Sequence, residues 1–147
     1  MMTMSTAGIA FLKGWETCRL DEYLDQKGNP TIGWGHKLLP GEHYPYGISQ
    51  AVADQLLQED LLPHEAYVSQ FNVPMSQLQF DALCDLSYNE GSFGPHLSVA
   101  LRNQDWPGIC AVMLTYDHEG SAVSPGLLKR RQAEVRIIET GVYDATH

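Results

Sequence analysis

Two carboxyl groups and a hydroxyl group near the beginning of the chain have the residue types and spacing of a hydrolytic site. They belong to Glu16, Asp25 and Thr31. In glycoside hydrolysis one carboxyl group protonates the leaving oxygen, while the other activates water or attacks the sugar. The two groups need unequal environments, because the donor must keep its proton while its partner stays ionised. Any acidic chain offers carboxylates at such spacings, so solvated side chains beside a turn remain an alternative.

The elements expected around these residues would bring them together. Ser5 or Thr6 can cap a helix that ends at Glu16, because apolar residues recur there at helical spacing. The run DQKGNP, which starts at Asp25, is a dense turn signal between two short apolar runs and predicts an antiparallel hairpin. Glu16 would then end a helix, Asp25 would lie in the turn, and Thr31 would begin the returning strand.

Most of the remaining chain reads as helix. The expected helices are one capped by Ser49 that Pro63 ends or bends, one from the capping box of Ser76 and Gln79 to Gly91, a short one over Pro95–Arg102, one begun by Asp105 and Pro107, and one from Ser124 and Pro125 to Gly141.

These elements predict an α+β fold in one domain over residues 1–147. A small antiparallel β lobe, about 17–47, would pack against a larger helical lobe, about 49–147 plus the N-terminal helix. The cleft between the lobes is where a site is expected. The loop from Leu39 to Ile48, rich in Pro, Gly and Tyr, is interpreted as a mobile lip of that cleft.

Composition excludes several classes of protein. The chain has 147 residues, 44% of them hydrophobic, and a net charge of −9, which argues against nucleic acid as a partner. Cys18, Cys84 and Cys110 form no metal-ligand pattern and read as free thiols of a reducing compartment. We expect no cofactor, no metal and a monomer. The first residues resemble neither a secretory signal nor a membrane span, so we expect a protein made in the cytoplasm that does not insert into membranes.

Two aromatic or basic features could support the site. Trp34 lies between two glycines and could form a wall for a sugar ring, or it could pack between the lobes. On the last helix Arg131 falls in the middle of the apolar face, where a guanidinium needs a carboxylate partner, and Glu16 is the candidate. Arg130 lies nearer the edge of that face and is expected to be the more solvated of the two.

Three motifs together resemble the phage-type lysozymes, glycoside hydrolase family 24. They are ETCRLDEYLD at 16–25 with Gly28 and TIGWGH at 31–36, ALCDLSYNEG at 82–91, and GLLKRRQAE at 126–134. The resemblance runs from Gly14 to Gly141. It implies a muramidase that cuts the β-1,4 bond between N-acetylmuramic acid and N-acetylglucosamine in peptidoglycan.

The resemblance also implies roles for individual residues. Glu16 would be the general acid, Asp25 would hold or activate the attacking water, and Thr31 would help to orient it. Transglycosylases related to this family need only the acid, so the presence of Asp25 and Thr31 favours hydrolysis. The family is regarded as inverting, which fits a water between two carboxylates.

Further contacts follow from the same resemblance. His36 and Asp60 match a histidine and an aspartate that the family often pairs across the lobe junction; an unpartnered surface histidine is the alternative. Either Arg130 or Arg131 could align with the arginine of the family. Glu90 departs from an apolar position and is expected to be a solvated carboxylate at a helix end.

The resemblance leaves three biological roles open. A phage endolysin would accumulate in the host cytoplasm and reach the wall through a separate holin. A secreted antibacterial effector would share the chemistry and have an immunity protein as partner. A catalytically silent module would bind glycan or protein, against which the intact Glu16, Asp25 and Thr31 argue. Members of the family are commonly basic, so the charge of −9 predicts that wall binding depends on the cleft.

Overall fold

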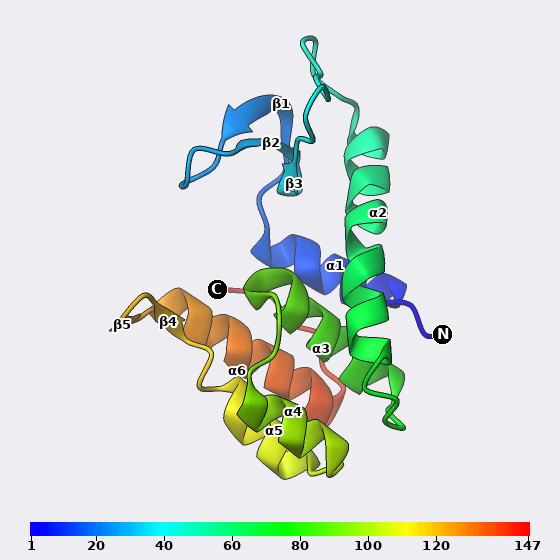
Figure 1. The fold of residues 1–147 in the computed structure, drawn as a ribbon, viewed down its shortest axis with the longest axis vertical. Helices are drawn as coiled ribbons and strands as arrows, with labels where there is room; N and C mark the ends of the chain where they lie inside the picture. Colours follow the sequence, from blue (N-terminus) through cyan, green and yellow to red (C-terminus); the bar gives the residue numbers. More distant parts are fainter.

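The computed structural model describes residues 1–147 as six helices and five short strands. In chain order the elements are α1 (Thr6–Trp15), β1 (Arg19–Leu24), β2 (Pro30–Gly33), β3 (His36–Lys37), α2 (Gln50–Ser69), α3 (Gln77–Glu90), α4 (Pro95–Arg102), α5 (Trp106–Met113), β4 (His118–Glu119), β5 (Ala122–Val123) and α6 (Pro125–Thr140). The expected α+β class is confirmed. In Figure 1 the long helix α2 runs from the β lobe down to the bundle of α3–α6, and α1 lies between the two lobes.

The β lobe is an antiparallel sheet in the order β1-β2-β3. Tyr23 pairs with Thr31 across the first hairpin, and Thr31 pairs with Lys37 across the second. Gly28 supplies the positive φ of 81° that the turn between β1 and β2 requires. Ile32 on β2 is fully buried, and β2 packs against α2. The expected hairpin is thus present, and the two-residue strand β3 adds a third strand to it.

The helix starts follow the capping signals in the sequence. Side-chain oxygens of Ser5, Ser49, Ser76 and Ser124 accept backbone N–H groups at the starts of α1, α2, α3 and α6, and Ser76 with Gln79 forms a complete capping box. Gly141 ends α6 with a left-handed φ of 74°. The elements not expected from the sequence are the two-residue strands β3, β4 and β5.

Pro63 was expected to end or bend a helix. It does not end one, because α2 continues through Pro63 to Ser69. A proline inside a helix removes one backbone hydrogen bond. Packing outweighs that loss, since side chains on both sides of Pro63 are buried, including Leu57, Leu61 and Val68.

The core lies in the helical lobe, around α3. It joins residues from all six helices, with Leu12, Phe80, Leu83, Leu97 and Met113 among the fully or nearly fully buried side chains. The three cysteines are free, as expected. No helix has the length and apolarity needed to span a membrane.

Candidate active site

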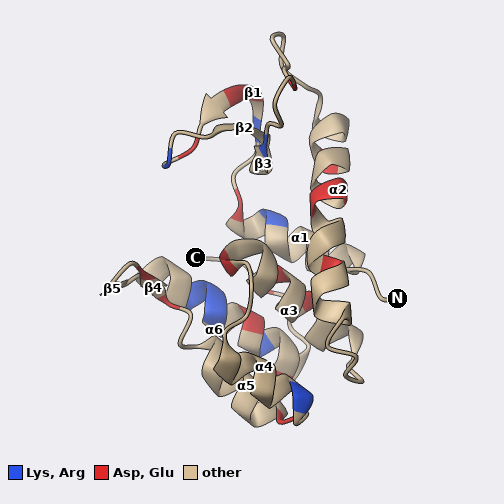
Figure 2. Ribbon diagram, in the orientation of Figure 1, with Lys and Arg blue, Asp and Glu red and all other residues tan.

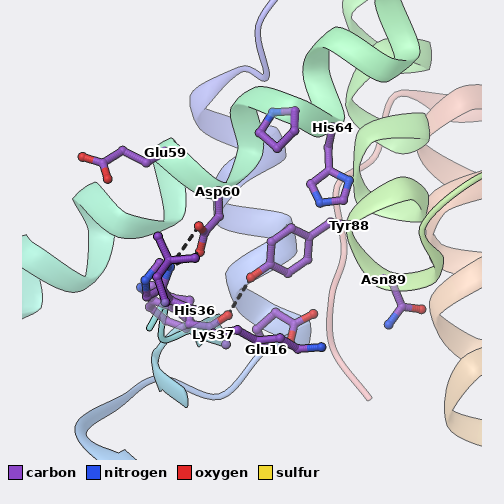
Figure 3. Close-up of a pocket in the computed structure, with 12 residues that line it drawn as sticks. Glu16, His36, Lys37, Glu59, Asp60, His64, Tyr88 and Asn89 are labelled. Carbon is purple, nitrogen blue, oxygen red and sulfur yellow. Dashed lines mark hydrogen bonds and ion pairs between the residues drawn. The ribbon is translucent and has the colours of Figure 1, made fainter. Parts of the chain in front are cut away.

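Glu16 lies at the base of a cleft between the lobes. It is the C-terminal cap of α1: its backbone is extended, and its N–H donates to the carbonyl oxygen of Leu12 at 3.1 Å. The side chain keeps 24% of its surface exposed, and its Oε1 accepts a hydrogen bond from Arg130 Nη1 at 2.8 Å. The cleft has a volume of about 590 Å³ and extends from Glu16 along the β2–β3 turn, α2 and the end of α3 (Figure 3).

Asp25 and Thr31 are joined through Asn29. The Oδ1 of Asp25 accepts the backbone N–H groups of Lys27 and Asn29, both at 2.8 Å, and its Oδ2 accepts Asn29 Nδ2 at 3.1 Å. These amides of Asn29, with that of Lys27, lower the pKa of Asp25. The Thr31 hydroxyl donates to the carbonyl oxygen of Asn29 at 2.8 Å, which leaves the lone pairs of its own oxygen free.

Tyr23 connects the hairpin with Glu16. Burial raises the pKa of Tyr23, and the charges of both Glu16 and Asp25 act in the same direction, so both carboxyl groups lie within electrostatic reach of this ring. Asp25 and Thr31 do not line the 590 Å³ cavity, which lies on the α2 and α3 side of Glu16. Asp25 and Thr31 thus lie on the β1–β2 hairpin, and of the three expected site residues only Glu16 opens into the main cleft.

His36 forms the expected ion pair with Asp60, at 2.9 Å through Nδ1, and a second one with Glu42, at 3.0 Å through Nε2. Burial lowers the pKa of His36, but the two carboxylates outweigh it and raise the pKa overall. Burial raises the pKa of Asp60 despite the facing histidine. Figure 3 shows His36 and Asp60 together on one wall of the cleft.

The loop from Leu39 to Ile48 is fastened to the β lobe. Glu42 accepts hydrogen bonds from the backbone N–H of Leu39 and from the hydroxyl of Tyr44, and the Tyr44 N–H donates to Glu22 at 2.7 Å. The Ile48 N–H donates to the carbonyl of Leu20. These contacts join the loop to β1 and, through Glu42, to His36, and the expected mobility of the loop stays a prediction.

Trp34 lines the cleft and also packs against the core. Its Nε1 donates to Asp54 on α2 at 2.8 Å, and its carbonyl accepts the hydroxyl of Tyr88 on α3 at 2.7 Å (Figure 3). The ammonium of Lys13 lies 5.3 Å from the ring centroid. Both geometries considered for Trp34 are therefore present, since it joins the lobes and presents a surface to the cleft.

The expectation for the two arginines of α6 was wrong in its pairing. Arg130 is only 5% exposed and bridges Glu16 and Asp85, whereas Arg131 is fully buried as expected but pairs with Glu90 and Glu134. A helical wheel assumes one buried face, but both α3 and α5 pack against α6 (Figure 1). The edge position of Arg130 is therefore buried as well. Glu90 is correspondingly an ion-pair partner of Arg131 at 3.0 Å and not a solvated carboxylate.

Several residues of the site escaped the sequence analysis. Asp85 is fully buried on α3, and its position among apolar neighbours is the same kind of signal that singled out Arg131. His64, Tyr88 and Asn89 line the helical wall of the cleft. His64 Nδ1 lies 2.8 Å from the Ser87 hydroxyl, and burial lowers its pKa. No group of three or more His, Cys, Asp or Glu side chains converges as a metal site would require.

Comparisons with known proteins agree on one family. The family model for phage lysozyme matches residues 13–134. An endolysin of Acyrthosiphon pisum secondary endosymbiont phage 1 is 33% identical over 149 residues, covering 95% of this chain and 99% of that protein. An endolysin of Salmonella phage P22 is 41% identical over 106 residues, covering 69% and 73%. The solved endolysin from Escherichia coli O157:H7 phage FAHEc1 superposes with a TM-score of 0.85 at 28% identity, covering 97% of each chain.

Proposed function

Because the chain belongs to the phage lysozyme family and is a muramidase of the endolysin type, we propose that Glu16 and Asp25 divide the chemistry of peptidoglycan hydrolysis between them. The observation that carries this proposal is the contrast between their environments. Asp25 is held ionised by amide donors on an accessible turn, while Glu16 is half-buried at the base of the cleft. A proton donor beside a stable carboxylate is the arrangement that glycoside hydrolysis requires.

Glu16 acts as the general acid. Arg130 Nη1 donates to Oε1 of Glu16, so the proton belongs on Oε2. During the reaction that proton passes to the glycosidic oxygen as the bond from this oxygen to the anomeric carbon breaks. The released sugar carries a hydroxyl group, and Glu16 is left as a carboxylate beside Arg130.

Asp25 activates the water that replaces the leaving group. Its carboxylate accepts a proton from the water as the water oxygen bonds to the anomeric carbon. The free lone pairs of the Thr31 oxygen can accept the other hydrogen of that water, because Asn29 fixes Asp25 and Thr31 relative to each other. Attack from the face opposite to the leaving group inverts the anomeric carbon.

The cleft walls hold the glycan. The Trp34 ring offers an apolar surface on which a sugar can stack, and its tie to Asp54 fixes its orientation. His36 and Asp60 join β3 to α2 and keep the wall opposite α3 in place. They act through position and are not in the reaction itself.

Glu16→Gln and Asp25→Asn test these roles on purified sacculi, measured by the release of reducing ends. Glu16→Gln is expected to abolish release, and Asp25→Asn to reduce it nearly as far, with the fold intact by circular dichroism. Glu59→Gln is the matched control, because Glu59 lines the cleft without contacting Glu16, and it is expected to retain activity. Appreciable hydrolysis by Glu16→Gln would overturn the assignment.

We further propose that the protein acts as a monomer on the cell wall after a separate holin releases it from the host cytoplasm. Kinship with endolysins supports this route and does not favour an effector with an immunity protein or a silent module. Expression in a bacterial cytoplasm with and without a holin tests it. Lysis only when the holin is present is expected, and lysis without any holin would contradict the route.

A further inference from the structure

Arg130 is shared between the proposed acid and a deeply buried carboxyl group. Its Nε and Nη2 donate to the two oxygens of Asp85 at 2.9 and 3.0 Å, and its Nη1 donates to Glu16. Asp85 is fully buried, whereas Glu16 is partly exposed. The bidentate pair with Asp85 therefore neutralises the guanidinium charge of Arg130 more strongly than the single contact with Glu16 does.

The second arginine extends this network. Arg131 Nη2 contacts Glu134 Oε1 at 2.7 Å, and its Nη1 contacts Glu90 at 3.0 Å. Glu134 also lies 4.0 Å from Arg130 Nε, so it faces both guanidinium groups. Two arginines thus meet four carboxyl groups in a largely buried cluster. If all four were ionised, two negative charges would be left without partners, which is costly away from water.

One of the four carboxyl groups shows where a proton resides. Glu134 Oε2 is buried and receives no hydrogen bond from any donor. Asp85 by contrast receives a hydrogen bond from Arg130 on each of its two oxygens, so the carboxyl oxygen that lacks a donor, and can carry a proton, is on Glu134. Burial raises the pKa of Glu134 well above its usual range; burial opposes ionisation of Asp85 too, but Arg130 lowers its pKa overall. The proton therefore belongs to Glu134.

We propose that Glu134, as a neutral protonated carboxyl group, and Asp85, as the carboxylate that neutralises Arg130, are positioning residues that let Glu16 hold its catalytic proton. With one proton on Glu134 and one on Glu16, the two arginines and the two remaining carboxylates balance. Arg130 then orients Glu16 without forcing it into the carboxylate form. The inference rests on the proposed role of Glu16 as general acid.

The other groups that face this network are compatible with it. Glu16 also faces the phenols of Tyr23 on β1 and Tyr88 on α3, and burial raises the pKa of each, so both rings stay neutral. Asp85 lies next to the thiol of Cys84, which burial likewise keeps protonated. None of these groups supplies a charge that could replace Asp85 as the counterion of Arg130.

Infrared spectroscopy tests the proton on Glu134 without reference to catalysis. Wild-type protein and Glu134→Gln are compared near neutral pH, because glutamine keeps the shape of the side chain but has no carboxyl group. The wild type is expected to show a carboxylic-acid carbonyl band that the variant lacks. Identical spectra in this region would overturn the proposal. This outcome does not depend on the activity measurements that test the role of Glu16.

The pH profile of hydrolysis tests the effect on Glu16. A general acid works only while protonated, so the alkaline limb of the activity profile reports on the acid. Glu134→Gln should keep the wild-type alkaline limb. The double variant Asp85→Asn, Glu134→Gln leaves Arg130 no carboxylate except Glu16, and its alkaline limb should move to lower pH by roughly one unit or more.

Glu139→Gln, an exposed change near the C-terminal end of α6 and outside the lining of the cleft, is the control and should not move the profile. An unmoved limb in the double variant would show that the network does not set the protonation of Glu16. A limb that moves as far in Glu134→Gln alone would show that Glu134 is an ordinary carboxylate. If the double variant does not fold, the infrared comparison still decides whether Glu134 holds a proton.

Discussion

At the scale of single residues, the site depends on which charges are paired below the cleft. Arg130 contacts the proposed acid, while its neighbour Arg131 is directed away to Glu90 and Glu134. Adjacent residues on a helix point in directions about 100° apart, so the two guanidinium groups have different main partners and share only Glu134. The sequence identified both arginines but could not assign most of their partners, because Glu16 at the end of α1 and Asp85 and Glu90 on α3 lie far away along the chain.

The pairing of Glu90 with a fully buried arginine predicts a stability effect. Glu90→Leu should lower the free energy of unfolding by about 1 to 3 kcal/mol, because Arg131 loses one of its charged partners in a buried site. Chemical denaturation measures the change, with Glu139→Leu on the exposed side of α6 as the control. An unchanged or raised stability would show that Arg131 does not need Glu90.

At the scale of elements, the cleft wall is held by an ion-pair cluster that joins β3, the 39–48 loop and α2. The three partners are His36, Glu42 and Asp60. Because the pKa of His36 is raised in the folded state, its contribution to stability is complete below its ordinary pKa of about 6.5. That contribution is lost as the pH rises through the raised value.

His36→Gln should therefore cost more stability at pH 6 than at pH 9. Denaturant unfolding of both proteins at the two pH values measures it. His43→Gln is the control, since His43 is 74% exposed. The pair should also weaken in acid as Asp60 gains a proton, because burial raises the pKa of Asp60. A cost of His36→Gln that is the same at both pH values would contradict this account.

Local signals allowed most elements to be predicted, and long-range contacts account for what was missed. The caps at Ser5, Ser49 and Ser76 and the turn at Gly28 act over a few residues, so the sequence shows them directly. The continuation of α2 through Pro63 depends on tertiary packing on both sides of it. The site follows the same division, since Glu16, Asp25 and Thr31 are marked by a local motif whereas the counterions of Arg130 are not.

At the scale of the whole molecule, the negative charge works against contact with an anionic wall. The net charge is −9, and acidic side chains are spread over both lobes, including α2 beside the cleft (Figure 2). If binding depends on the cleft, moderate salt should raise the rate of lysis by screening repulsion, between about 10 and about 150 mM. Turbidity of a sacculus suspension measures the rate. A steady fall over this range would indicate attraction between bulk charges.

We propose that the two lobes form one folding unit, because α2 belongs to both and residues from all helices share one core. Denaturant unfolding should then give coincident transitions by tryptophan fluorescence, which Trp34 reports beside the β lobe, and by the circular dichroism of the helices. Two separated transitions would show that the lobes unfold independently.

The first product of peptidoglycan digestion tests the central claim most directly. That claim is that Glu16 protonates the leaving oxygen while Asp25 directs water to the opposite face. Nuclear magnetic resonance of the fresh digest, with mass analysis of the fragments, identifies the new muramic end. The account predicts a hydrated reducing end that forms first as the α-anomer from the β-linked substrate. A β-anomer formed first, or a 1,6-anhydro end without added water, would contradict it.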